Sequence, residues 1–154
     1  MRVQAEVAID AAPHDVFAFI TVPAHGSRWQ EGAVSTVLTT AGPIGVGSEM
    51  AHVGRWLGVR FPTRATVTVF EPDRRFGYDL FSRFGSSVMR YDLERNGDGT
   101  KLTLSTEAAL PFLMRPFASI LEQNVARMFE RDVQRLKTVI EADLGTPDTS
   151  RDPA

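Results

Sequence analysis

Three polar side chains on otherwise apolar strand faces are the first candidates for binding or proton-transfer chemistry. Tyr78 shares a face with large apolar neighbours in the strand predicted over residues 76–81, and Tyr91 does so in the strand predicted over residues 87–95. His52 has the same kind of position in a third predicted strand. A phenol or imidazole in an apolar interior must find a protein partner or a ligand. The sequence therefore predicts polar groups that face the interior.

Large apolar side chains make up most of the remaining candidate site, because the same periodicities turn them toward the interior. The residues predicted to line a ligand pocket are Phe17, Trp29, Met50, His52, Phe76, Tyr78, Met89, Tyr91, Phe117, Leu121 and Met128. An ordinary packed core is the alternative interpretation, since large apolar side chains are most often simply buried. The ten phenylalanines of the chain suit a core and an apolar cavity equally well.

The histidines and cysteines give no sign of a metal site or of nucleophilic catalysis. His14, His25 and His52 lie on different predicted elements without a carboxylate at ligand spacing, so neither a metal nor a cofactor is expected. His25, four residues before Trp29, could act as a general base at a pocket mouth or could be an ordinary surface or capping residue. Ser48 and His52 lie too far apart along a strand for a direct hydrogen bond. The chain has no cysteine, which excludes thiol catalysis and disulfides.

The composition is that of one globular domain without a nucleic-acid-binding surface. The chain has 154 residues, of which 43% are hydrophobic and 23% are charged. The net charge is −2 and the 17 basic residues are spread along the chain, so nucleic acid is not an expected partner. No apolar run approaches the roughly 20 residues of a membrane span or the length of a signal peptide. We expect a cytoplasmic protein without stable membrane insertion; the oligomeric state does not follow from the sequence.

Alternating patterns predict about seven antiparallel strands. Val3 to Ile9 alternate with mainly polar residues and predict the first strand. Further strands are predicted over residues 34–40, 48–55, 59–70, 76–81, 87–95 and 101–108. Turn-forming sequences separate them, of which residues 96–99, Asn-Gly-Asp-Gly, are the most specific. A sheet of this size curls when its strands twist.

Two short helical stretches are predicted directly after the first strand. Pro13 suits the first turn of a helix whose apolar stripe runs to Ile20, and Pro23 is predicted to stop this helix. Residues 24–29 are predicted to form a second short helical turn that ends in Trp29.

A long amphipathic helix is predicted near the C-terminus. Apolar residues recur at helical spacing from near Arg115 and Pro116 to Leu144, and Gly145 is suited to end the helix. About 30 residues span ~45 Å, enough to cross a small sheet. Residues 1–145 are therefore predicted to form one domain with a pocket between sheet and helix. Residues 146–154 lack a large apolar side chain and are predicted to be a disordered tail.

Three loop segments have sequences that suggest special roles. Residues 42–47, GPIGVG, lack the GxGxxG spacing and lead into a strand, so a loop at the pocket rim is predicted instead of a phosphate site. Residues 55–58, RWLG, followed by Arg60 and Phe61, form one predicted hairpin tip with aromatic and cationic side chains, and residues 83–86, RFGS, form a similar one. Such tips could bind anionic ligand heads, a membrane surface or a partner protein, or could be solvated turns.

Five sequence blocks in this order resemble START-like helix-grip proteins of the polyketide cyclase/dehydrase type, the SRPBCC superfamily. The blocks are VAIDAAPHDVFAFITVPAHGSRW, GPIGVGSEM, TVTVFEPDRRFGYDL, GDGTKLTL and RDVQRLKTVIEADL. The resemblance extends over residues 1 to about 144. It implies an α+β fold in which a curved antiparallel sheet of seven strands grips the C-terminal helix, with two short helices after the first strand. The periodicities alone predict the same arrangement.

The resemblance implies a pocket but not one reaction, because members of the superfamily bind lipids, sterols, polyketides, hormones or aromatic compounds and only some are enzymes. The leading hypothesis is binding, transport or sequestration of a small hydrophobic molecule, lipid-like or aromatic and polyketide-like. Whether the protein is an enzyme stays open.

Two alternatives belong to other functional classes. A cyclase or dehydratase would use Tyr78, Tyr91, His52 or His25 as proton donor or acceptor around a substrate folded against Phe17, Trp29 and Met89. A protein-interaction module would act through its exterior and have a filled interior. A sizeable cavity with polar groups favours the first two hypotheses, and a packed interior with an exposed apolar hairpin favours the third.

Overall fold

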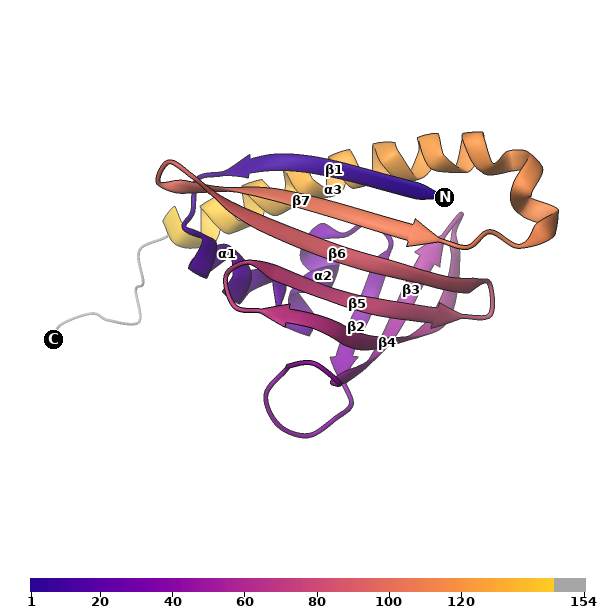
Figure 1. Cartoon of the computed structure of the whole chain (residues 1–154), viewed down its shortest axis with the longest axis horizontal. Coiled ribbons are helices and arrows are strands. Elements are labelled where there is room, and N and C mark those ends of the chain that lie inside the picture. Colours follow the sequence, from indigo (N-terminus) through magenta and orange to yellow (C-terminus); the bar gives the residue numbers. More distant parts are fainter. Residues whose placement is uncertain (146–154) are drawn as a thin grey trace, which may run out of the picture.

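A computed structural model describes residues 1–145 as a curved sheet that wraps around one long helix (Figure 1). The strands are β1 (Arg2–Ile9), β2 (Ala33–Leu38), β3 (Glu49–Trp56), β4 (Val59–Glu71), β5 (Arg75–Ser82), β6 (Gly85–Asn96) and β7 (Gly99–Ala108). The α-helices are α1 (Pro13–Ile20), α2 (Gly26–Trp29) and α3 (Ala118–Gly145), and the 3-10 helices are η1 (Pro23–His25) and η2 (Phe112–Phe117). The predicted α+β helix-grip class is confirmed. The tail predicted over residues 146–154 lies outside the described residues.

The seven strands of the described chain form one antiparallel sheet in the order β1-β7-β6-β5-β4-β3-β2. Because consecutive strands from β2 to β7 are joined as hairpins, the turns alternate between two ends of the sheet (Figure 1). The end with the β3–β4 and β5–β6 turns and the segment after β7 is called the open end here. The end with the β4–β5 and β6–β7 turns and α1 is called the closed end.

Strand β1 illustrates why these sequences form strands with one buried face. Its side chains alternate between exposed and buried, and the buried ones are Val3, Ala5, Val7 and Ile9. Val7 lies opposite Leu102 of β7, which is 0% exposed. The period of two in the sequence therefore becomes one apolar face that lies against α3.

Helix α3 crosses the concave face of the sheet, but its two halves are packed differently. In the second half Val133, Leu136 and Ile140 are at most 2% exposed and belong to the core. In the first half Leu121 is buried, whereas Ile120 is 61% exposed. The continuous apolar stripe in the sequence therefore serves as a core in one half and as a partly open wall in the other.

The long helix begins later than the sequence predicts. Arg115 and Pro116, the predicted start, belong to the 3-10 helix η2, and α3 begins at Ala118. Proline has no N–H to donate and restricts the residue before it, so a regular α-helical turn is disfavoured at this point. The helical turn predicted over residues 24–29 likewise divides into η1 and α2, with Pro23 as the first residue of η1.

The strand boundaries differ from the predicted ones by at most two residues. The largest differences are at the starts of β6 and β7 and at the end of β2, where the predictions were residues 87, 101 and 40. Pairing continues to the hairpin turns in β6 and β7, with Asn96 opposite Gly99.

No helix within residues 1–145 has both the length and the apolar character that crossing a bilayer requires.

Candidate functional site

The space between sheet and helices consists of a small inner cavity and a larger outer chamber. The inner cavity has a volume of about 30 Å³, and the outer chamber, toward the open end, has a volume of about 500 Å³. His52 and Leu80 line both spaces, which therefore adjoin at these two side chains. The inner cavity has room for roughly one or two water molecules. The outer chamber falls in the size range of small-molecule binding sites.

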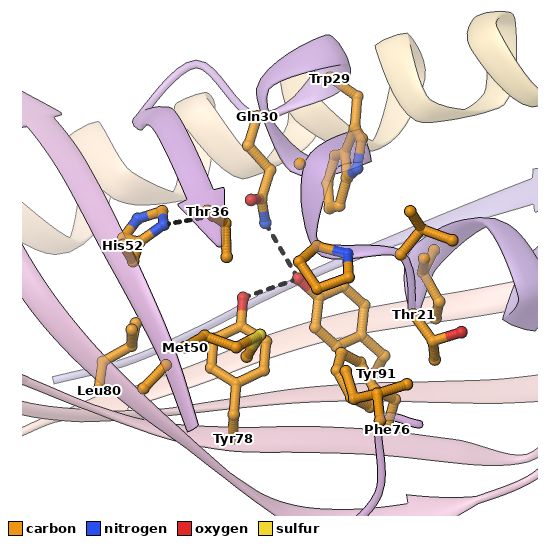
Figure 2. Close-up of a pocket in the computed structure, with 16 residues that line it drawn as sticks. Thr21, Trp29, Gln30, Thr36, Met50, His52, Phe76, Tyr78, Leu80 and Tyr91 are labelled. Carbon is orange, nitrogen blue, oxygen red and sulfur yellow. Dashed lines mark hydrogen bonds between the residues drawn. The ribbon is translucent and has the colours of Figure 1, made fainter. Parts of the chain in front are cut away.

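A chain of hydrogen bonds forms the polar wall of the inner cavity (Figure 2). The Gln30 side chain, directly after α2, donates from Nε2 to the Tyr91 hydroxyl at 3.0 Å. The Tyr91 and Tyr78 hydroxyl oxygens are 3.1 Å apart. Tyr78 on β5 and Tyr91 on β6 occupy diagonal positions on the concave face, because Tyr78 lies opposite Met89 in the register of the two strands. The fold thus brings together two phenols from neighbouring strands.

The two tyrosines have one hydroxyl hydrogen more than they have acceptors among the described residues. Each phenol has one hydrogen to donate, and the bond between Tyr78 and Tyr91 uses one of the two, whichever phenol is the donor. The Gln30 bond uses an amide hydrogen and occupies an acceptor lone pair of Tyr91. One O–H group of the pair is therefore available to an acceptor oxygen in the cavity.

Burial keeps both phenols neutral. Burial is the main cause that raises the pKa of Tyr78 above its ordinary value of 10.0, and the neighbouring polar groups of Tyr91 and Gln30 oppose this shift. Burial also raises the pKa of Tyr91 well above 10.0, with a further contribution from the neighbouring Tyr78. At neutral pH the pair therefore acts as a hydrogen-bond donor and not as a phenolate base.

Helix α3 holds the segment that carries Gln30. The carboxylate of Asp132, whose side chain is 4% exposed, accepts a hydrogen bond from the Glu31 backbone N–H at 2.9 Å. Arg135 Nη1 donates to the Trp29 carbonyl oxygen at 3.2 Å. Burial is the main cause that raises the pKa of Asp132 to about 6. The residues on both sides of Gln30 are thus bound through their backbones to one face of α3.

His52 and Thr36 form a second polar pair at the junction of the two spaces. His52 Nδ1 lies 2.7 Å from the Thr36 hydroxyl, and the pairing of β2 with β3 places the two residues directly opposite each other (Figure 2). Burial lowers the pKa of His52 below its ordinary value of 6.5, so the imidazole is neutral at pH 7. A neutral imidazole can donate from one ring nitrogen and accept at the other.

The outer chamber is mostly apolar. Met89 of β6 and Leu121, Val125 and Met128 of α3 line it, among other residues. Thr63 also lines this chamber. Among the described residues, its hydroxyl oxygen Oγ1 is the buried side-chain oxygen or nitrogen that has no hydrogen-bond partner. A buried hydroxyl without a partner is destabilising, so it is a second place where a bound molecule could offer a polar atom.

The structure brings most of the predicted site residues to one of the two spaces. Trp29, Met50, His52, Phe76, Tyr78 and Tyr91 line the inner cavity, and His52, Met89, Leu121 and Met128 line the outer chamber. The remaining two lie elsewhere. Phe17 is in the core, where its ring contacts Phe70 edge-on at 5.2 Å, and Phe117 is 54% exposed at the open end. That the lining residues bind a ligand stays a prediction.

The other two histidines have partners outside both spaces. His14 is exposed on α1 and its Nδ1 lies 3.1 Å from Asp73 Oδ1. His25 stacks on Phe19 and donates from Nδ1 to the Phe19 carbonyl oxygen at 2.9 Å. Both therefore have structural contacts. Within residues 1–145 no group of three or more His, Asp or Glu side chains could hold a metal ion.

Several polar lining residues were not predicted from the sequence, among them Gln30, Thr36 and Thr63. Thr36 could have been found, because the strand pairing that the hairpin pattern predicts places it near His52. Thr63 lies on the inward face of β4, where every second residue from Thr63 to Val67 is buried. Gln30 gave no signal, because its position depends on the backbone contacts of a loop with α3.

Comparison with known proteins gives one family and many structural neighbours. A family model described as "Polyketide cyclase / dehydrase and lipid transport" matches residues 1–141. No curated protein sequence matches the chain.

Solved structures with this arrangement come from several bacteria. The protein TTHA0849 of Thermus thermophilus superposes with a TM-score of 0.76 at 15% identity, over 93% of this chain and 99% of that chain. A conserved protein of Geobacillus kaustophilus gives a TM-score of 0.74 at 14% identity, over 93% and 97% of the two chains. The protein of unknown function SA2116 of Staphylococcus aureus gives 0.73 at 12% identity, over 95% and 96%. At these identities the likeness concerns the fold alone.

Proposed function

The chain belongs to the polyketide cyclase/dehydrase and lipid transport family, and from this premise we propose that it binds and carries a small hydrophobic molecule with one acceptor oxygen. The hydrocarbon body of this molecule occupies the outer chamber of about 500 Å³. The oxygen reaches the tyrosine pair in the inner cavity. The observation that carries the proposal is the spare O–H group of Tyr78 and Tyr91 beside an apolar space.

The chemistry of the walls favours a neutral oxygen, such as that of a carbonyl, ether or hydroxyl group. The two phenols and the neutral His52 carry no charge, and no Lys or Arg side chain lines the inner cavity. A carboxylate placed there would lose its hydration without gaining a counter-ion. The inner cavity, of about 30 Å³, has room for a functional group but not for a ring. A cytoplasmic location stays a prediction from the sequence.

An enzyme of the cyclase or dehydratase type is the second candidate. A neutral phenol that donates to a carbonyl oxygen polarises it, and the neutral imidazole of His52 at the junction can accept a proton. The test is turnover of a bound carbonyl compound, with a pH profile that changes in Tyr91→Phe. The third hypothesis, an interaction module with a filled interior, is disfavoured by the outer chamber.

The first experiment is native mass spectrometry of the purified protein, followed by organic extraction and identification of released molecules. The proposal predicts a near-stoichiometric hydrophobic molecule with at least one oxygen. Because a bare protein could have lost its ligand, binding is also measured by displacement of a fluorescent apolar probe with a long-chain methyl ketone.

A variant pair tests where the molecule binds. Val125→Trp places an indole in the outer chamber and should abolish probe and ketone binding. Asn124→Trp, on the neighbouring exposed position of α3, adds the same side chain outside the chamber and should bind as the wild type does. If both variants bind normally, or the wild type binds neither compound, the proposal is wrong. Thermal denaturation checks that both variants are folded.

A further inference from the structure

Apolar side chains are exposed together around the entrance of the outer chamber. Residues 55–60, 81–86 and 111–117 of the open end are called the entrance rim here (Figure 1). Within it Leu57 and Leu113 are each 81% exposed, Phe112 is 78% exposed and Phe84 is 48% exposed. Trp56, Phe84 and Pro111 also line the chamber, so the three segments surround one opening. Such a group of exposed apolar side chains marks an interaction surface.

Contacts between the segments hold the rim together. Phe61, next to the first segment, contacts Phe84 edge-on with the ring centres 5.2 Å apart. The backbone N–H of Ala109 donates to the Ser86 carbonyl oxygen at 3.4 Å, which joins the β5–β6 turn to the segment after β7. The exposed side chains are therefore presented by connected elements of the fold.

Leu57 occupies a backbone position that does not suit it. It is the first central residue of the β3–β4 turn and has φ of 50°, followed by Gly58 with φ of 78°. Turns of this kind favour Asn, Asp or Gly, and a leucine there is strained. At 81% exposure its side chain does not contribute to the core either. Neither the turn nor the packing explains a leucine here, whereas an apolar phase outside the protein does.

The charge of the rim is entirely positive. Four of the 17 basic residues of the chain, Arg55, Arg60, Arg83 and Arg115, and none of its 19 acidic residues lie in the three segments. All four are exposed, and none is in an ion pair with another residue of the described chain. The guanidinium groups of Arg83 and Arg115 lie 4.8 and 5.9 Å from the ring centres of Phe84 and Phe112. The rim therefore pairs apolar rings with unneutralised cations.

We infer that the entrance rim docks on an anionic phospholipid bilayer. Leu57, Phe112 and Leu113 enter the interface between head groups and acyl chains, and the four arginines contact lipid phosphates. A second copy of the chain fits less well, because a symmetric contact of two rims would set cations against cations. The net charge of the whole chain is −2, so attraction to an anionic surface must come from this local concentration of arginines.

Docking by the rim would set the chamber entrance against the phase in which hydrophobic molecules dissolve. This inference uses the surface and the charge of the open end and does not depend on what fills the chamber. It therefore goes beyond the proposed carrier function and is tested separately.

The experiment is co-sedimentation of the full chain with vesicles of phosphatidylcholine alone and of phosphatidylcholine mixed with phosphatidylglycerol. We expect binding to the mixed vesicles that weakens as the salt concentration rises. The double variant Arg83→Gln/Arg115→Gln should weaken binding about fivefold for each arginine. The control Arg74→Gln/Arg95→Gln changes the net charge equally at the closed end and should bind as the wild type does.

Leu57→Asn separates docking from folding. Asparagine suits the turn, so the variant should be at least as stable as the wild type, while its vesicle binding should fall about tenfold. Leu113→Gln should act in the same direction. Val125→Trp, which fills the chamber, should retain vesicle binding. If the wild type docks on vesicles but binds neither the probe nor the ketone, the carrier function is wrong and the docking inference stands.

Three outcomes would overturn the inference. The first is no binding to mixed vesicles at low salt. The second is equal loss of binding in the rim and control double variants, which would assign the effect to net charge. The third is concentration-dependent self-association, measured by analytical ultracentrifugation, that Leu57→Asn abolishes in the absence of vesicle binding, which would make a second copy the partner.

Discussion

The two ends of the sheet differ in what their turns expose and in what lies beneath them. At the closed end the turns contain Asp73 and Asp98, and the core below includes Leu102 and Leu136, both 0% exposed. At the open end the turns expose Leu57 and other apolar side chains, and a chamber of about 500 Å³ lies below. A hollow chamber lacks the packing contacts of a filled core, so the closed end must supply most of the stability.

Several cations near the closed end are in ion pairs, although Arg74 and Arg95 there have none within the described residues. Near the closed end Arg75 pairs with Glu71 and Asp92, and Lys101 pairs with Glu6. The arginines of the entrance rim have no such partners in the described chain. One hydrophobic sheet and one amphipathic helix therefore enclose a packed core at one end and a chamber at the other. The polar chain of Gln30, Tyr91 and Tyr78 lies between them.

The largest expected effect is a loss of stability at the closed end. Leu136→Ala removes a fully buried side chain from a filled core and should lower the free energy of unfolding by about 2–5 kcal/mol. Val125→Ala, at a residue of the same helix that lines the chamber, should cost about half as much or less, because less packing is lost. Chemical denaturation measures both. Equal losses would contradict the division of α3 into a core half and a chamber half.

The next largest expected effect is a pH dependence of stability caused by Asp132, which lies between the two ends of the sheet. Burial raises its pKa in the folded chain to about 6 from an ordinary value of 3.8, so the folded state holds this proton more tightly. Its contribution to stability is full below pH 3.8 and is lost as the pH rises to about 6. Asp132→Asn should remove this slope and stabilise the chain at pH 7 by roughly 1–3 kcal/mol. Denaturation of both proteins at several pH values is the measurement; parallel curves would contradict the raised pKa.

A smaller effect is expected in ligand preference at the tyrosine pair. Tyr78→Phe and Tyr91→Phe each leave one phenol, so each should keep a donor for the ligand oxygen. The double variant should lose about fivefold in affinity for a long-chain methyl ketone, the usual effect of one hydrogen bond. Affinity for the alkane of equal length, measured by the same probe displacement, should stay within about twofold of the wild-type value. Parallel losses for ketone and alkane would point to a change in cavity shape.

The smallest effect on stability is expected at the open end. Leu113→Gln, at a residue that is 81% exposed, should change the free energy of unfolding by less than about 0.5 kcal/mol. Thermal denaturation compared with the wild type measures this change. A loss as large as that of Leu136→Ala would mean that the entrance rim is part of the folding core, and the contrast between the two ends would not hold.

Much of the fold could be predicted because its signals are local. Alternation in β1 and helical spacing in α3 depend only on which face of each element is buried, so strand boundaries were correct to within two residues. The start of α3 was wrong because Pro116 and the preceding Arg115 form a 3-10 helix. Neither the alternation in the strands nor the helical spacing shows at which residue a helix begins.

The site was predictable only in part. Tyr78, Tyr91 and His52 stood out as polar groups on apolar faces, and all three line the inner cavity. Phe17 and Phe117 have the same residue type and similar spacing, but the first is in the core and the second is exposed. Core residues and lining residues have the same apolar spacing in the sequence. Only the distance between helix and sheet decides which of them line a space.

The sequence by itself determined the order of the elements, the buried face of each strand, the family and the apolar and cationic character of the hairpin tips. The tertiary structure alone decided three further features. These are the contact between the two phenols, the position of Gln30 through backbone bonds to α3, and the division of the interior into a filled and a hollow half. The reason is that each of them depends on distances between segments remote in sequence, which no local pattern encodes.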